Sequence, residues 1–105
     1  MSKNDENIMM VEGKKLDDNK LNYALMPWQP IDEVIKVLMF GAKKYGADNW
    51  KQVIDARRRY LSAAYRHINA YAEGHQNDDE SGFKHLAHAM CCLIFILWFD
   101  LNEKS

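Results

Sequence analysis

Residues 81–101, SGFKHLAHAMCCLIFILWFDL, decide the fold class of this chain. Large apolar side chains recur there every three to four residues, which predicts a helix. One seam of this helix consists of Leu86, Met90, Leu93, Leu97 and Leu101. Other apolar residues cover much of the remaining surface, and a helix with so few polar positions needs neighbours on most of its sides. The short chain supplies too few of them, so we predict that a second copy completes a helical bundle.

Two further helices are expected upstream. The first spans 30–45, because Pro30 suits a first turn, where its missing N–H needs no partner, and Gly46 supplies a stop. Its buried stripe is predicted to be Ile31, Val34, Ile35, Leu38, Ala42 and Tyr45. The second spans 55–73, with Asp55 as candidate N-cap. Its predicted core stripe is Leu61, Ala64, Ile68, Tyr71 and Ala72.

Length and composition restrict the remaining organisation. At 105 residues the chain is expected to hold one domain over 13–105, after a flexible tail over 1–12. Residues 13–29 should be an irregular arm laid across the surface. The net charge of −1 provides no global basic field, so no nucleic-acid partner is expected. The longest apolar run, 89–99, is shorter than the about 18 residues of a membrane helix. With the adjacent Cys91 and Cys92 interpreted as reduced thiols, we expect a cytoplasmic protein without a membrane partner.

Histidines and carboxylates gather around the connection between the last two helices. His85 and His88 are three residues apart and share one side of the last helix. Asp78, Asp79 and Glu80 precede that helix, while His67 flanks the core stripe of the preceding one. These side chains offer nitrogen and oxygen ligands for a divalent metal. The alternative is that the histidines are hydrogen-bonded interface residues and that the acidic run complements the helix dipole. The residues alone slightly favour this structural alternative.

Two other groups could bind a nucleotide. The first is the set of cations that could hold phosphates: Lys43, Lys44, Arg57, Arg58 and Arg59, with Lys14, Lys15 and Lys20 in the arm. A solvated helix surface is the alternative interpretation of such a charge run. The second is Asn49-Trp50, where a base could stack on the indole and be read by the amide. Trp50 could equally pack into the corner between the first two helices.

Several strings in one order resemble a known family. They are, in chain order, Lys15-x-Asp17-x-x-Lys20 with Leu25-x-Pro27, FGAKKYG at 40–46 with Asn49-Trp50, Arg59-Tyr60, Arg66-His67, and ESGFKHLAHA at 80–89. This order is similar to the N-terminal domain family of phage dATP/dGTP diphosphohydrolases, which are MazZ-like proteins of the MazG-like superfamily. The resemblance covers 14–97 and implies an all-α, MazG-like helical bundle that assembles as a dimer or larger oligomer. It also implies divalent-metal-dependent cleavage of dATP or dGTP to the monophosphate and pyrophosphate.

The resemblance also implies roles for individual residues. The residues expected to take part in catalysis are Glu33, His67 and Glu80. The expected metal ligands, for Mg, Mn or Co, are Asp79, His85 and His88, and these six side chains should converge on one polar pocket. The expected substrate-binding residues are Lys20, Lys43, Lys44, Asn49, Trp50, Arg59 and Arg66. One departure is that Glu33-x-x-Lys36 and His85-x-x-His88 stand where MazG-like sites carry paired carboxylates.

Two other functions fit the same residues. A phage protein could keep the fold and sequester a nucleotide or a host defence component without turnover. A purely structural protein could use its apolar last helix to dock on another chain. Metal-dependent release of pyrophosphate would separate the enzyme, which would act in the host cytoplasm if phage-encoded, from both alternatives.

Overall fold

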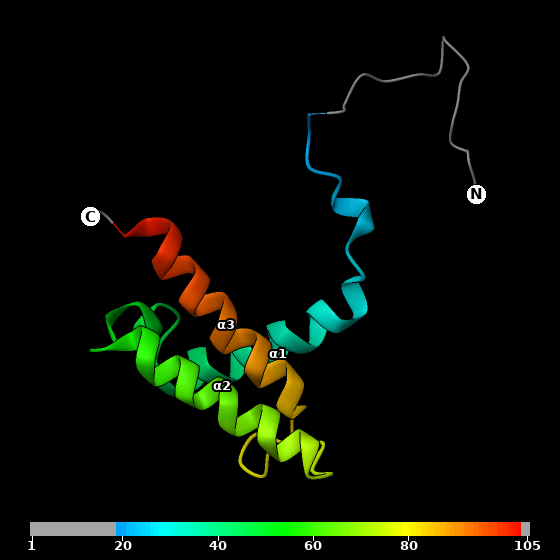
Figure 1. The fold of residues 1–105 in the computed structure, drawn as a ribbon, viewed down its shortest axis with the longest axis vertical. Helices are drawn as coiled ribbons and strands as arrows, with labels where there is room; N and C mark the ends of the chain where they lie inside the picture. The colour runs from blue at the N-terminus through cyan, green and yellow to red at the C-terminus, as the bar shows by residue number, and fades with distance from the viewer. Residues whose placement is uncertain (1–18, 104–105) are drawn as a thin grey trace, which may run out of the picture.

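The computed structural model describes residues 19–103, and its centre is an antiparallel pair of helices. Helix α2 (Ala56–Ala72) and helix α3 (His85–Asn102) run in opposite directions and make most of the tertiary contacts (Figure 1). Both helices bury only small side chains: Ala56, Ala64, Ala87, Ala89, Cys91 and Cys92. Such small residues let two helix backbones approach closely. Side chains on the two helices, such as His67 and His85, can then contact each other.

Helix α1 (Trp28–Tyr45) packs against α3 and contributes two valines to the core. Val34 and Val37 lie against Ala87 and Cys91, and Val34 is only 2% exposed. Phe83, from the connection between α2 and α3, packs on the same cluster. The core therefore holds this connection against α1.

The prediction of an all-α fold is confirmed, since the described residues contain helices and no strand. Two short 3₁₀ helices, η1 (Tyr23–Leu25) and η2 (Asn49–Gln52), precede α1 and α2. Residues 19–27 form an irregular arm apart from η1, but they are exposed, and Figure 1 shows them extending away from the helices, so the expectation that the arm lies across the surface is wrong. The expected tail over 1–12, and Lys14 and Lys15, lie outside the described residues.

The predicted helix limits need two corrections. Helix α1 begins at Trp28, two residues before the predicted start, and Pro30 still lies in its first turn. Helix α3 begins at His85 and not at residue 81, because the backbone of Gly82 takes a φ of +77° that a right-handed helix does not allow. Asp55 stands at the predicted N-cap of α2, but its carboxylate accepts a hydrogen bond from Arg58 and makes no cap bond.

The predicted buried stripes are only partly correct. In α1 the side chains of Ile35 and Tyr45 are exposed, and Val37, which the prediction omits, is buried. In α2 the apolar positions Leu61, Ile68 and Tyr71 are exposed, as is Ala72. The whole predicted seam of α3, Leu86, Met90, Leu93, Leu97 and Leu101, also faces outward. Close packing of the α2–α3 pair favours small residues, so the large ones are displaced to the outer face.

Helix α3 is long and apolar enough to cross a membrane by length and composition alone. Its residues His85–Asn102 have a mean hydropathy of 1.4, and 17% of them are buried. This finding qualifies the expectation, drawn from the shorter apolar run 89–99, that the chain has no helix long enough to cross a membrane. A soluble core helix passes the same test when it is mostly buried, and here the protomer leaves most of α3 uncovered.

Candidate functional site

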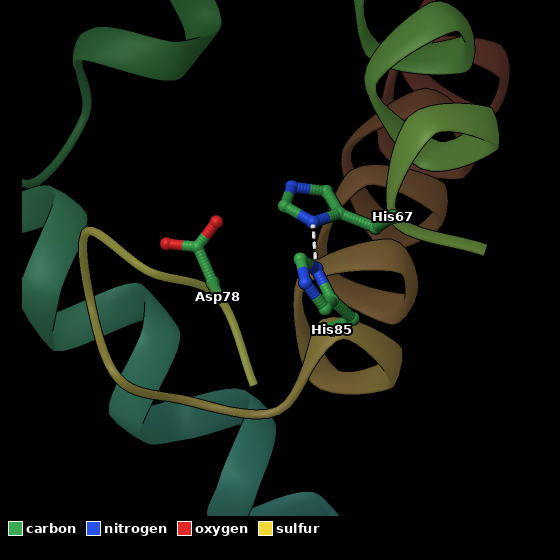
Figure 2. Close-up of side chains that lie close together, drawn as sticks. All are labelled: His67, Asp78 and His85. Carbon is green, nitrogen blue, oxygen red and sulfur yellow. Dashed lines mark hydrogen bonds between the residues drawn. The ribbon is translucent and has the colours of Figure 1, made fainter. Parts of the chain in front are cut away.

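Two histidines and an aspartate converge where α2 ends and α3 begins. His67 lies near the C-terminal end of α2, His85 is the first residue of α3, and Asp78 lies on the connection between them (Figure 2). The Nδ1 atoms of His67 and His85 are 2.9 Å apart, at hydrogen-bonding distance. One ligand atom from each of the three residues lies within 4.8 Å of the others. We call these three residues the His-Asp cluster.

The connection over 73–84 holds Asp78 in place through its own backbone. The Asp78 N–H donates to the Phe83 carbonyl at 2.8 Å, and the Asp78 carbonyl accepts from the Gly82 N–H at 2.8 Å. The Ser81 N–H donates to Asp78 Oδ2 at 2.9 Å. Phe83 packs on the hydrophobic core and against Phe40 of α1, and these contacts fix the position of the turn. The Asp78 carboxylate therefore reaches the histidines from a fixed backbone.

His88 lies beside the cluster and contacts it through its ring. The rings of His67 and His88 are stacked, with centroids 4.6 Å apart and planes within 14°. His88 Nε2 is 2.7 Å from the Ser81 hydroxyl, which also accepts the Phe83 N–H at 3.1 Å. The distance from His88 Nε2 to Asp78 Oδ2 is 3.9 Å, longer than a hydrogen bond.

The environment favours the neutral form of His67 and His88 and the charged form of Asp78. Burial lowers the pKa of His67 from 6.5 to about 4, and nearby His88 adds to this shift. Burial also lowers the pKa of His88, against the opposing influence of Asp78. Burial alone would raise the pKa of Asp78, but the hydrogen bonds from Ser81 outweigh it and lower that pKa. Near neutral pH His67 and Asp78 are thus in the protonation states that metal ligands require.

The donor set suits a divalent ion of borderline character. Two imidazole nitrogens and one carboxylate oxygen are ligands that Zn²⁺, Mn²⁺ or Co²⁺ use in proteins. Two nitrogens bound to one ion stand about 3 Å apart, close to the 2.9 Å between His67 and His85. A hollow of about 490 Å³ borders the cluster, and its lining includes His75, Asp79 and His85. The hollow gives an ion a route from solvent.

The other carboxylates expected in this pocket lie elsewhere or at its margin. Asp79 is exposed and lines the hollow, but it does not belong to the His-Asp cluster. The Glu80 carboxylate accepts from the Lys44 ammonium and so connects the turn to α1. Glu33 pairs with Lys36 one turn along α1, at 2.9 Å. The expected six-residue convergence is therefore corrected: the structure groups His67 and His85 with Asp78, and His88 stands beside them.

Among the cations expected to bind phosphate that lie within residues 19–103, most have partners within the protein. Arg57 donates to Asp100 and Glu103 of α3, Arg58 donates to Asp55, and Arg59 donates to the carbonyl of Ile54 at 3.3 Å. Lys44 pairs with Glu80. The remaining candidates, Lys20, Lys43 and Arg66, are exposed.

Trp50 packs into an aromatic cluster instead of facing solvent with a free ring. It stacks on Phe95 with centroids 4.3 Å apart and meets Trp98 edge-on at 5.1 Å. Phe95 occupies one face of the indole, and the ring packs on α3 and not in the corner between α1 and α2. Base stacking on Trp50 stays a prediction. Asn49 is exposed at the start of η2 beside this cluster.

Sequence reasoning missed Ser81 as a member of the site, and it included Asp78 in the acidic run but assigned the site roles to Asp79 and Glu80 instead. Three acidic residues in a row gave no reason to choose Asp78 over its neighbours. A signal does exist, since Asp78-x-x-Ser81-Gly82 has the spacing at which an aspartate side chain accepts a backbone N–H three residues on. That hydrogen bond orients the Asp78 carboxylate.

Comparison with known proteins identifies a family. The family model described as dATP/dGTP diphosphohydrolase, N-terminal, matches residues 10–105. A dATP/dGTP diphosphohydrolase of Salmonella phage PMBT28 is 37% identical over 93 residues, which cover 89% of this chain. The chain spans only 31% of the length of that relative. No solved structure matches the chain significantly. These matches confirm the resemblance seen in the sequence strings.

Proposed function

Because the chain belongs to the family of dATP/dGTP diphosphohydrolase N-terminal domains, we propose that it hydrolyses a purine deoxynucleoside triphosphate. The products would be the monophosphate and pyrophosphate, and the reaction would need a divalent metal. The observation that carries this proposal is the His-Asp cluster, whose three ligand atoms lie within 4.8 Å of one another beside an open hollow. We place the enzyme in the cytoplasm of a phage host.

His67, Asp78 and His85 would hold the metal. When bound, the ion would supply positive charge that offsets the triphosphate and would activate a water molecule. The chain orients its ligands beforehand, since Asp78 is held by Ser81 and the two Nδ1 atoms already face each other. Two imidazoles make Mn²⁺ or Co²⁺ better suited than Mg²⁺.

Lys44 is the cation best placed to contact phosphates. Through Glu80 it adjoins the turn that carries Asp78, so an incoming phosphate would compete with Glu80 for its ammonium group. Arg59 lies eight residues before His67 on α2, about 12 Å away along the helix axis. Arg59 is therefore proposed as a contact farther from the reacting bond, and Lys20, Lys43 and Arg66 are proposed as further phosphate contacts.

The apolar outer face of the α2–α3 pair supports assembly into a dimer or larger oligomer. Leu93 and Leu97 of α3 are exposed, and a groove of about 740 Å³ on α2 is lined by Leu61 and Tyr65, among others. A monomer rarely leaves so much contiguous apolar surface in water, and a second copy would cover it. Light scattering at low protein concentration should give at least twice the chain mass. A well-folded monomer, or a protein extracted only with detergent, would contradict the proposal.

Turnover is tested by incubating the protein with each deoxynucleoside triphosphate and with Mg²⁺, Mn²⁺ or Co²⁺. We expect monophosphate and pyrophosphate from dATP or dGTP, fastest with Mn²⁺ or Co²⁺, and nothing with a chelator. Chromatographic separation of the products distinguishes this reaction from release of single phosphates. The same incubation with Asp78→Asn is the matched control, because this variant keeps the side-chain shape and removes the charge.

The second candidate function is nucleotide binding without turnover. One observation favours it: the His-Asp cluster contains one carboxylate. Tight binding of dATP or dGTP with no product, even with Mn²⁺, would support sequestration over catalysis.

A further inference from the structure

We infer that Ser81 and His88 are positioning residues of the metal centre and that His88 is not a ligand. The inference rests on the proposed function, because it concerns how the metal ligands are held. It departs from the sequence motif, in which His85 and His88 stand as an equivalent pair. In the structure the two histidines have different partners.

Ser81 holds two parts of the site at once. Its backbone N–H donates to Asp78 Oδ2 at 2.9 Å, which orients one ligand. Its hydroxyl lies 2.7 Å from His88 Nε2 and accepts the Phe83 N–H at 3.1 Å. Since the Phe83 side chain packs on the core, the hydroxyl has a fixed position. Ser81 thus connects the Asp78 ligand, His88 and the core.

His88 supports the second ligand through its ring face. Its imidazole is stacked on that of His67 at 4.6 Å, so it restricts rotation of the His67 ring. Its Nε2 atom is engaged by Ser81, whichever partner carries the proton. His88 also lies outside the group whose ligand atoms meet within 4.8 Å. A side chain with one nitrogen engaged and its face against a ligand is placed to orient that ligand.

Loss of such support weakens a metal site without removing it. Residues that orient the ligands typically contribute 10–100-fold to metal affinity. Removal of a ligand also changes the coordination of the ion. Co²⁺ reports both properties, since its visible spectrum depends on the number and type of ligands and its titration yields an affinity.

The first experiment titrates the full chain with Co²⁺ and compares three serine variants. Ser81→Ala should weaken binding about 10–100-fold while keeping the wild-type spectral shape. Ser81→Thr keeps a hydroxyl and should restore the affinity to within about threefold. Ser62→Ala, on the exposed groove of α2, is the matched control and should behave as wild type. Far-UV circular dichroism checks that each variant is folded.

The second experiment separates positioning from ligation at His88. His88→Gln retains a planar group that can bond to Ser81, so the Co²⁺ spectrum should keep its shape with moderately weaker binding. His85→Ala removes a proposed ligand and should abolish the spectrum. Loss of the spectrum in a folded His88→Gln variant would make His88 a ligand and overturn the inference, as would unchanged affinity in Ser81→Ala. If the wild type bound no Co²⁺, the proposed metal centre would fail as well, so the two failures are distinguishable.

Discussion

The two ends of the α2–α3 pair differ in the contacts that their polar side chains make. At the end where α2 begins, Arg57 pairs with Asp100 and Glu103, and Trp50 stacks in an aromatic cluster. At the opposite end His67 and His85 share a hydrogen bond beside an open hollow. We call these the aromatic end and the histidine end.

From this difference we propose that the aromatic end serves stability and the histidine end serves function. At the aromatic end opposite charges meet and rings pack, as expected for a structural closure of the helix pair. At the histidine end burial lowers the pKa of His67 and His88, so the fold maintains neutral imidazoles at a cost in stability. Perturbed titratable groups around a hollow are typical of functional sites. The following predictions test this division, beginning with the largest expected effect.

Replacing a cluster ligand should act on metal binding alone. His85→Ala removes one of three ligand atoms, and we expect Mn²⁺ affinity to fall by more than about 100-fold in a folded protein. The matched control is His75→Ala, because His75 lines the same hollow outside the cluster. Isothermal titration calorimetry measures both affinities. An equal loss in the control would point to nonspecific binding in the hollow.

Replacing Trp50, the central side chain of the aromatic end, should lower stability without changing metal affinity. Trp50→Ala deletes contacts with Phe95 and Trp98, and we expect about 3 kcal/mol of lost stability, at the low end for tryptophan because the ring is half-buried. Trp28→Ala, at a 50% exposed residue, should cost far less. Urea unfolding measures both. A folded Trp50→Ala protein with lost metal affinity would mean that the two ends are not independent.

Acid should destabilise the metal-free protein through the histidine end. The folded-state pKa of His67 is about 4 against 6.5 for an ordinary histidine. Between pH 6.5 and pH 4 this histidine is mostly protonated in the unfolded chain and mostly neutral in the folded chain. The free energy of unfolding therefore decreases as the pH falls through this range. The thermal midpoint followed against pH should decline there, and His67→Gln should flatten the decline. An equally steep decline in His67→Gln would assign the effect to other groups.

The Arg57 ion pairs should contribute least. Arg57→Ala breaks contacts with Asp100 and Glu103 that lie at the surface, where solvent and salt screen the attraction. We expect the thermal midpoint to fall by no more than a few degrees, and by less in high salt. Arg58→Ala, which loses only a local pair with Asp55, is the control and should change it even less. A large, salt-independent loss would show that the pairs are more deeply desolvated than their exposure indicates.

Local sequence patterns predicted the fold class and part of the site. Three helices follow from periodic apolar residues, a first-turn proline and a stop at Gly46, because helical hydrogen bonds join residues four apart. His67 and His85 were recognised as candidate site residues for a similar reason, since histidines near helix ends are conspicuous in sequence. Membership of the family was likewise readable from short strings such as residues 40–46.

Only the tertiary structure decided which side chains meet. His67 and His85 are 18 positions apart, Lys44 and Glu80 are 36 apart, and Arg57 and Asp100 are 43 apart. No helical period relates such pairs, because their contact depends on how α1, α2 and α3 pack. The choice of Asp78 over Asp79 depends on the turn at Gly82 and on Phe83 in the core. The outward position of the α3 seam has the same origin, since close packing against α2 and α1 selects the small residues for the inside.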